Sequence, residues 1–419
     1  MTTRPDRELD IVLVGATGFV GRLTARHLAE HAPPGLRLGL AGRSAERLAA
    51  LQQTLPEEAA GWPLITVDVL DDAAVADLAG RCRVVASTVG PYLRYGLPLV
   101  RACATAGTHY ADLTGETLFV RRSIDAAHET ARASGARIVH SCGFDSVPSD
   151  LGVGLTARQA AVDGAGELTA PVLHVRSLRG GISGGTIDSL RQQIIENERD
   201  PSGRRLLGDP KALVDDVVDR PYGSKRPGRR PVARDERSGI WHAPFVMGPY
   251  NRQIVHRSNA LTGWSYGREL SYHEVVDTGP GPRGLITATA LAAGTSALMA
   301  GMMFGPTRLV LDRLLPAPGE GPSEQVRDNG RFRIEVTAGT TDGPRYRTTI
   351  AADRDFGYGG TAVMLGESAL ALAAEERLGA AGVVTPMVAL GEVLPERLRS
   401  RGFEVTTEEA PEVIPPTAD

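Results

Sequence analysis

A short apolar strand that runs directly into three spaced glycines constrains this chain more than any other feature. The strand is Ile11 to Val14, the glycines are Gly15, Gly18 and Gly21, and a helical pattern follows from Phe19 to about His31. Gly15 allows a sharp turn, Gly18 lets backbone approach a pyrophosphate, and Gly21 lets the helix pack closely on the strand. We therefore expect a dinucleotide whose phosphates lie on the helix N-terminus. The predicted phosphate-binding residues are Gly15, Ala16, Thr17, Gly18, Phe19, Val20 and Gly21.

The second predicted strand, Arg37 to Ala41, indicates which dinucleotide is bound. It ends in Gly42, Arg43 and Ser44 and lacks the acidic residue that accepts from the ribose 2′-hydroxyl in an NAD site. Arg43 offers a guanidinium fork suited to a 2′-phosphate, and Ser44 offers a second donor and an N-cap for the next helix. We therefore expect NADP(H), with a merely solvated Arg43 as the alternative.

From Ala45 to Ser141 the pattern continues as helices alternating with short apolar strands. Such alternation predicts a Rossmann-type, doubly wound parallel sheet of the α/β class, whose ligands bind beyond the carboxyl ends of the strands. Asp68, after the third strand, could accept from the adenine amino group or simply cap its loop. Further cofactor contacts are expected after the fourth strand, at Thr88, Val89, Gly90 and Pro91.

Length and composition limit the class of protein. A chain of 419 residues exceeds one ordinary domain, and its 42% hydrophobic and 23% charged residues are typical of a soluble globular protein. A net charge of −4 makes a dedicated nucleic-acid binder unexpected. Cys82, Cys103 and Cys142 lack the spacing of a disulfide framework or metal site. The polar segment before the first strand favours a cytoplasmic protein.

Beyond Asp150 the alternation weakens, and a second, α+β domain is expected. Half-buried antiparallel strands are predicted where apolar and polar residues alternate, namely at Arg252 to His256, Ser265 to Tyr272, Gly330 to Ala338 and Arg345 to Ala352. The glycine-rich segment Arg179 to Thr186 is interpreted as a helix-capping loop or an anion site. The arginine-rich segment Arg220 to Arg237 is a solvated loop or a contact for an acidic carrier protein or phospholipid headgroups.

The predicted organisation has four parts. An NADP-binding domain covers residues 1–150, the α+β domain covers 151–355, helices that pack back on the first domain cover 356–400, and a tail, disordered from Thr406, covers 401–419.

One segment of the second domain is uncharged from Gly284 to Thr307 and flanked by Arg283 and Arg308. It is long enough to cross a bilayer, but it is rich in Ala, Gly and Thr rather than Leu and Ile. A buried or substrate-lining helix and a helix lying on a membrane surface both remain open. We expect contact with lipid or an acyl chain without a crossing, which would place the protein in the cytoplasm or peripherally at the inner face of the plasma membrane.

Several motifs together resemble a known family. GATGFVG, AGRS, STVGPYLRYGLPLVRACATAGTHYADLTGE and CGFDSVPSDLG, followed by SGGT, RSNAL and GVVTP, are similar to the saccharopine dehydrogenase-like oxidoreductases and most of all to the trans-acting enoyl reductases. The resemblance covers nearly the whole chain. It implies NADPH-dependent reduction of an enoyl acyl or polyketide thioester in lipid or glycolipid synthesis, with the acyl group on coenzyme A or on a carrier protein.

Enoyl reduction leaves an enolate that needs a hydrogen-bond donor and a proton. Tyr92, Tyr110 and Asp112 follow or end the fourth and fifth strands and are the predicted catalytic residues, with Glu116 and Asp145 farther away. Packing and backbone hydrogen bonding are the competing roles for the tyrosines.

Three other classes of protein share parts of this pattern. A short-chain dehydrogenase would carry Tyr-x-x-x-Lys, which no tyrosine of this chain begins. A saccharopine dehydrogenase-like enzyme with another substrate stays open, as does a non-catalytic NADP-sensing regulator.

Overall fold

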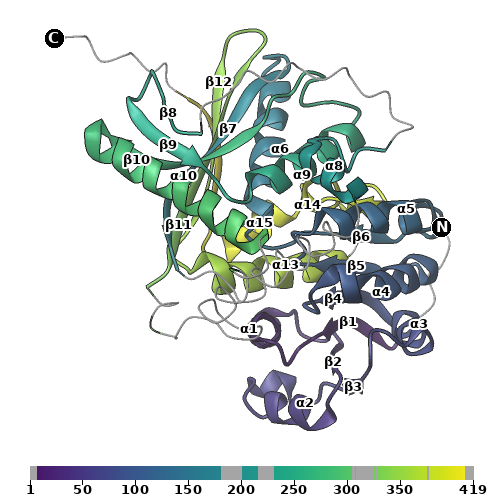
Figure 1. Cartoon of the computed structure of the whole chain (residues 1–419). Helices are drawn as coiled ribbons and strands as arrows, with labels where there is room; N and C mark the ends of the chain where they lie inside the picture. The colour runs from purple at the N-terminus through teal and green to yellow at the C-terminus, as the bar shows by residue number, and fades with distance from the viewer. Residues whose placement is uncertain are drawn as a thin grey trace.

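Two sheets of 7 strands each organise the chain in a computed structural model (Figure 1). The structure describes residues 7–180, 201–215, 231–303, 307, 325, 329–374 and 377–410. The expected Rossmann-type sheet with a second, mixed α/β unit is confirmed.

The first sheet is parallel throughout, in the order β3-β2-β1-β4-β5-β6-β13. Its strand order changes direction between β1 and β4, where doubly wound sheets open a crevice for ligands. The strands are β1 Leu9–Val14, β2 Leu38–Gly42, β3 Leu64–Thr66, β4 Cys82–Ser87, β5 His109–Asp112, β6 Arg137–Val139 and β13 Gly382–Val384. The intervening helices are α1 Phe19–His31, α2 Ala45–Gln52, α3 Asp72–Arg81, α4 Tyr92–Ala106 and α5 Thr117–Ser134.

Both faces of this sheet are buried, which explains why its strands are almost entirely apolar. Val12 and Val85 pack with residues of α3, α4 and α5 on one face. Ile11 and Val84 pack with α1 and with α13, Thr361–Ala374, on the other. The same core continues through α6, Val147–Val162, into the second sheet.

The second sheet has the order β14-β12-β11-β7-β10-β9-β8, and only β10 and β7 are parallel neighbours among the strands that the structure describes. Helix α6 packs on β11 and β12, and α10 packs on β9 and β10. The strands are β7 Leu168–Arg179, β8 Ala233–Arg234, β9 Ile240–Pro244, β10 His273–Pro280, β11 Arg331–Thr340, β12 Arg345–Ala352 and β14 Glu404–Glu409. The remaining helices of this part are α8 Pro201–Gly208, α9 Gly248–Leu261 and α10 Gly281–Met303.

The C-terminal part of the chain contributes to both sheets. β13 pairs with β6 at the edge of the first sheet, and helices α14, Pro386–Leu390, and α15, Leu394–Ser400, follow it. β14 then pairs with β12 of the second sheet. The prediction of a disordered tail from Thr406 is wrong as far as Glu409, because this segment completes a ladder whose Val405 is buried beside Ile350.

Two predicted strands of the second domain are also wrong. Arg252 to His256 lies inside α9, and Ser265 to Tyr272 is an irregular loop that leads into β10. Helix α9 is buried on nearly all sides, including polar Asn251 and Gln253, so it lacks the polar face that usually reveals a helix. Most of the glycine-rich segment Arg179 to Thr186 and most of the arginine-rich segment Arg220 to Arg237 lie outside the described residues, because 181–200 and 216–230 are not described.

Candidate functional site

The turn after β1 has the geometry that a pyrophosphate requires. Gly15 has a φ of 82°, in the left-handed region that favours glycine. A Cβ atom on Gly21 would lie 2.2 Å from the carbonyl oxygen of Gly15, so no larger residue fits there. Gly18 is the N-cap of α1 and has no side chain that could cap this helix, an arrangement that suits an anion at the helix N-terminus. The residues fit a dinucleotide.

The turn packs against the carboxyl end of β4. The Thr88 hydroxyl donates to the carbonyl oxygen of Gly15 at 3.0 Å. A Cβ on Gly15 would lie 2.8 Å from both Thr88 Oγ1 and Val89 Cγ2. The structure therefore brings together the predicted cofactor residues of the first and fourth strand ends, with Gly90 and Pro91 leading from there into α4.

Arg43 is exposed at the end of β2, and the part of the chain that the structure describes gives its side chain no hydrogen-bond or ion-pair partner. Its guanidinium is free to meet a phosphate. Ser44 is the N-cap of α2, as predicted, and accepts from the backbone N–H of Arg47 at 3.2 Å. Asp68 is exposed and accepts from the backbone N–H of Leu70 at 3.0 Å, which is the loop-capping role; its adenine contact stays a prediction.

Two of the predicted catalytic residues are buried in the core. Tyr110 is fully buried among residues of α4 and α5, behind the sheet. Asp112, also fully buried, accepts from the backbone N–H of Ser141 at 3.0 Å and lies 2.8 Å from His140 Nδ1. It ties the end of β5 to the residues after β6. Because neither side chain reaches the surface, these contacts favour structural roles, and the catalytic assignment of Tyr110 and Asp112 stays a prediction.

The third predicted catalytic residue, Tyr92, has structural partners as well. Its hydroxyl donates to the Ser87 carbonyl oxygen at 3.1 Å and accepts from the Leu113 N–H at 3.2 Å. Burial raises the pKa of this hydroxyl well above its usual value. The Glu116 carboxylate, fully buried, accepts from the N–H groups of Tyr92 and Leu93 and so caps α4. These bonds favour a structural role for Tyr92, whose hydroxyl hydrogen is directed at backbone, and its assignment as proton donor stays a prediction.

His140 links Asp112 to Ser123 of α5, whose Oγ lies 2.7 Å from His140 Nε2. The connectivity is that of a Ser-His-Asp triad. All three side chains are buried, however, so no substrate carbonyl can reach Ser123. This network holds α5 on the sheet and is not a hydrolase site.

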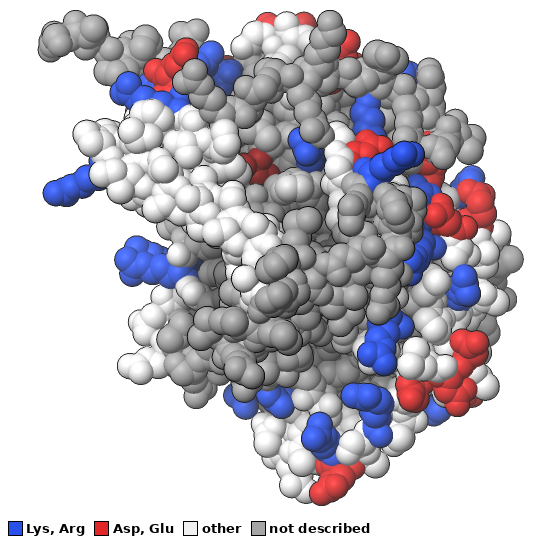
Figure 2. Space-filling model, viewed as in Figure 1, with Lys and Arg blue, Asp and Glu red and all other residues white. Residues whose placement is uncertain are grey.

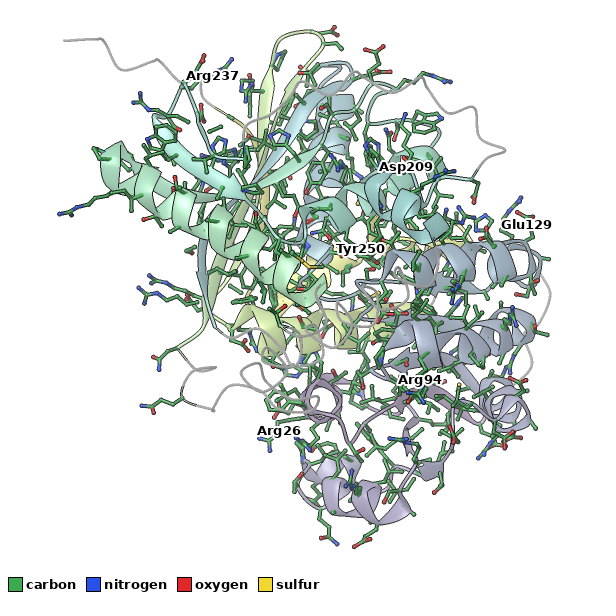
Figure 3. The ribbon with its side chains drawn as sticks, viewed as in Figure 1. Arg26, Arg94, Glu129, Asp209, Arg237 and Tyr250 are labelled. Carbon is green, nitrogen blue, oxygen red and sulfur yellow. The ribbon has the colours of Figure 1, made fainter. Side chains whose placement is uncertain are left out.

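Residues that the sequence analysis passed over occupy the carboxyl edge between β5 and β6. Ser141 has a φ of 65°, which a non-glycine residue rarely adopts and which clusters at functional sites. Its Oγ donates to the Thr114 carbonyl oxygen at 2.8 Å and lies 2.6 Å from the hydroxyl oxygen of Tyr250. Tyr250 comes from α9, and Figure 3 shows it near the middle of the molecule. Burial raises the pKa of its hydroxyl.

Asp145 follows on the loop between β6 and α6. It is half-buried, and no described residue hydrogen-bonds to its carboxylate. Burial raises the pKa of this carboxyl to about 6. The position of Asp145 after the sixth strand is visible in the sequence, whereas no sequence signal points to Tyr250.

A buried carboxylate fixes α9 in this position. Glu274 of β10 accepts from Asn251 Nδ2 at 3.0 Å, from Ser149 Oγ at 2.7 Å and from the Tyr272 hydroxyl at 2.6 Å. Ser146 in turn donates to Asn251 Oδ1 at 2.8 Å. Because Asn251 is the neighbour of Tyr250, these bonds set where the tyrosine meets Ser141. Among the described residues, no group of His, Cys, Asp or Glu side chains is placed to hold a metal ion.

The fold and this edge define an NADP-dependent oxidoreductase. Residues 11–139 match the family model of the saccharopine dehydrogenase NADP binding domain. The apo saccharopine dehydrogenase (L-Glu forming) of Saccharomyces cerevisiae shares the fold, with a TM-score of 0.53 and 15% identity over 96% of this chain and 100% of that one.

Full-length relatives are more specific. A trans-acting enoyl reductase of Mycobacterium ulcerans is 44% identical over 96% of this chain and 98% of its own length. One from Mycobacterium tuberculosis is 45% identical with the same coverage. The chain belongs to the trans-acting enoyl reductase family.

Proposed function

We propose that the protein reduces the carbon–carbon double bond of an enoyl thioester, an acyl or polyketide intermediate of lipid or glycolipid synthesis. The names of its relatives support the reaction. The observation that carries the proposal is the half-buried carboxyl of Asp145, four residues after Ser141 on the loop that follows β6, at the sheet edge that also holds the glycine turn. Coenzyme A or a carrier protein would present the acyl group.

NADPH and the enoyl substrate require different groups at the carboxyl edge of the first sheet. The turn from Gly15 to Gly21, Thr88 and Arg43 would hold NADPH, which supplies a hydride when bound. Hydride addition at the β-carbon leaves an enolate, whose α-carbon must then take up a proton.

Asp145 is the group that we assign to this proton. Its pKa of about 6 lies close to neutrality, where a general acid can both give up and regain a proton. Ser141 and Tyr250 act as positioning residues, because their hydroxyl groups bond each other and the Thr114 carbonyl oxygen.

The test is isotopic. Reduction of an enoyl thioester with NADPH deuterated at the transferable hydrogen should place deuterium on the β-carbon and a solvent-derived hydrogen on the α-carbon. A product labelled at its carbonyl carbon, or an unchanged thioester, would contradict the proposal.

A further inference from the structure

Helix α10 exposes most of its surface. It lies along β9 and β10 and contacts the protein through a narrow stripe that includes Gly284, Ala288 and Met302 (Figure 1). It is the one helix, among the described residues, that is long and apolar enough to cross a membrane, and only 11% of its apolar stretch is buried. The helix of a soluble core would be mostly buried, so the outward face of α10 lacks a partner among the residues that the structure describes.

That outward face is apolar and uncharged. Ile286 is 68% exposed, and Leu285 and Leu291 are each 38% exposed. From Gly284 to Met303 the helix carries no charged residue. Figure 2 shows the corresponding uncharged surface, with basic side chains on both of its sides.

We propose that the outward face of α10 docks on the surface of an anionic lipid bilayer, with the helix in the plane of the interface. The charges beside it fit such a surface. Arg283 is exposed at the start of the helix, and Arg234 and Arg237 are exposed at the turn between β8 and β9, next to the strand on which α10 packs. The same turn carries Asp235 and the exposed Glu236, so the attraction to anionic headgroups rests mainly on Arg283. Basic residues flanking an apolar helical face attract anionic headgroups while the apolar side chains enter the acyl boundary.

The packing of α10 argues against a transmembrane orientation. With 23 residues it is about 34 Å long, which is sufficient for a span. Its inner stripe lies on β9 and β10, however, and β10 runs directly into the helix. A crossing would take hydrogen-bonded strands and the Asp277 carboxylate into hydrocarbon, where polar groups are costly.

The area of the helix argues against a second copy of the chain as the occupant. One face about 34 Å long and about 10 Å wide offers roughly 350 Å² per partner. A stable protein interface buries roughly 800 Å² per partner. A bilayer requires no such minimum, because each apolar side chain that enters it contributes separately.

Vesicle flotation of the full-length protein tests the inference without reference to catalysis. Wild-type protein should float with phosphatidylcholine vesicles that contain phosphatidylglycerol, and Ile286→Glu should lower the bound fraction roughly tenfold or more. Val162→Glu is the matched control, since Val162 is an apolar side chain 75% exposed on α6. It should bind as wild type does. Arg283→Glu should weaken the preference for anionic vesicles. Unchanged NADPH affinity of each variant shows that it is folded.

Three results would overturn the inference. If Ile286→Glu floats as wild type does, α10 does not contact the bilayer. Bound protein that resists carbonate and leaves only with detergent would indicate a span. A dimer in ultracentrifugation that Ile286→Glu dissociates, without vesicle binding by wild type, would assign the face to a second copy.

A site-specific probe reports on the same face. The native cysteines Cys82, Cys103 and Cys142 are all buried, so an introduced exposed cysteine can be labelled selectively. A polarity-sensitive fluorophore on Ala293→Cys should shift to the blue when vesicles are added, and the same label on Val162→Cys should not. Equal spectra at the two positions would contradict the inference.

Discussion

The hydroxyl oxygen of Tyr250 lies 2.6 Å from Oγ of Ser141. This contact joins helix α9, which packs on β10 of the second sheet, to the segment that follows β6 of the first sheet. Ser141 has left-handed backbone, which costs about 1–2 kcal/mol in a non-glycine residue. Its backbone N–H bonds to Asp112 and its hydroxyl to Thr114. The strained residue is therefore held both by the end of β5 in the first sheet and by α9, at the edge where the cofactor is expected.

Removal of the Tyr250 hydroxyl should loosen this joint. Tyr250→Phe should cost about 1 kcal/mol of stability and up to roughly tenfold in turnover, with NADPH affinity unchanged. Tyr266→Phe is the matched control, because the buried Tyr266 hydroxyl has no hydrogen-bond partner among the described residues. Thermal unfolding and steady-state rates measure both effects. If the two variants behave alike, the Tyr250–Ser141 bond does not position the site.

Arg43 should select the phosphorylated cofactor. Arg43→Ala removes a charge-assisted contact to the 2′-phosphate and should weaken NADPH binding by about 1.5–3 kcal/mol, or roughly ten- to a hundredfold. NADH binding should hardly change. Arg101→Ala is the control, because Arg101 is an exposed arginine in the second half of α4, away from the strand ends. Titration of NADPH and NADH against wild type and both variants measures these affinities. A wild type that binds NADPH and NADH equally well would contradict the role of Arg43.

The Asp145 carboxyl should appear in the pH profile. If its protonated form supplies the α-carbon proton, turnover should be level below pH about 6 and fall up to tenfold per pH unit above it, because burial raises the pKa of Asp145 to about 6. Asp145→Asn should lose roughly 10²-fold in turnover and this limb of the profile, while binding NADPH normally. A limb that persists in Asp145→Asn would assign the proton to another group.

Acid should destabilise the packing of α13 against α1 and α15 and so lower the free energy of unfolding. Glu367 is fully buried and bonds to His27 at 2.9 Å, to Arg397 at 2.8 Å and to Arg401 at 2.6 Å. Burial alone would raise the pKa of Glu367, but these partners outweigh it and lower the pKa. Burial lowers the pKa of His27 against the pull of Glu367.

A group whose pKa is lowered on folding stabilises the protein above its unfolded pKa and loses that contribution as pH falls. The free energy of unfolding should therefore drop as pH falls below about 6.5, first through His27, and again below about 4.5 through Glu367. Glu367→Gln should cost about 1–3 kcal/mol at neutral pH. Glu396→Gln is the control, because the Glu396 side chain is 71% exposed in its ion pair with Arg377. It should change the free energy of unfolding by no more than about 0.5 kcal/mol. Denaturant titrations across pH provide the check.

The first sheet could be predicted from sequence because its signals are local. Each parallel strand is a short apolar run, and the predicted bounds of α1, Phe19–His31, are those observed. The second sheet could not be predicted as well, since α9 buries polar residues that obscure its period and β14 gains its stability from pairing with β12. Those contacts are distant in sequence.

The same contrast between local signals and contacts distant in sequence explains why the cofactor site was easier to predict than the catalytic site. The glycines and Arg43 lie within one strand-turn-helix unit and its neighbour, whose spacing is visible in sequence. The partner of Ser141 is 109 residues away on α9, and the partner of the Tyr92 N–H is Glu116, so these contacts depend on tertiary packing. Sequence position at a strand end could not show this.

NADPH oxidation against a panel of enoyl thioesters of increasing chain length, on coenzyme A and on a carrier protein, tests the central claim most directly. Wild type should oxidise NADPH with at least one enoyl thioester and release the saturated thioester in equal amount, whereas Asp145→Asn should lose roughly 10²-fold in rate. Failure across the panel with NADPH binding intact would contradict the account and favour an NADP-sensing regulator, and turnover only with amino-acid substrates would favour a saccharopine dehydrogenase-like activity.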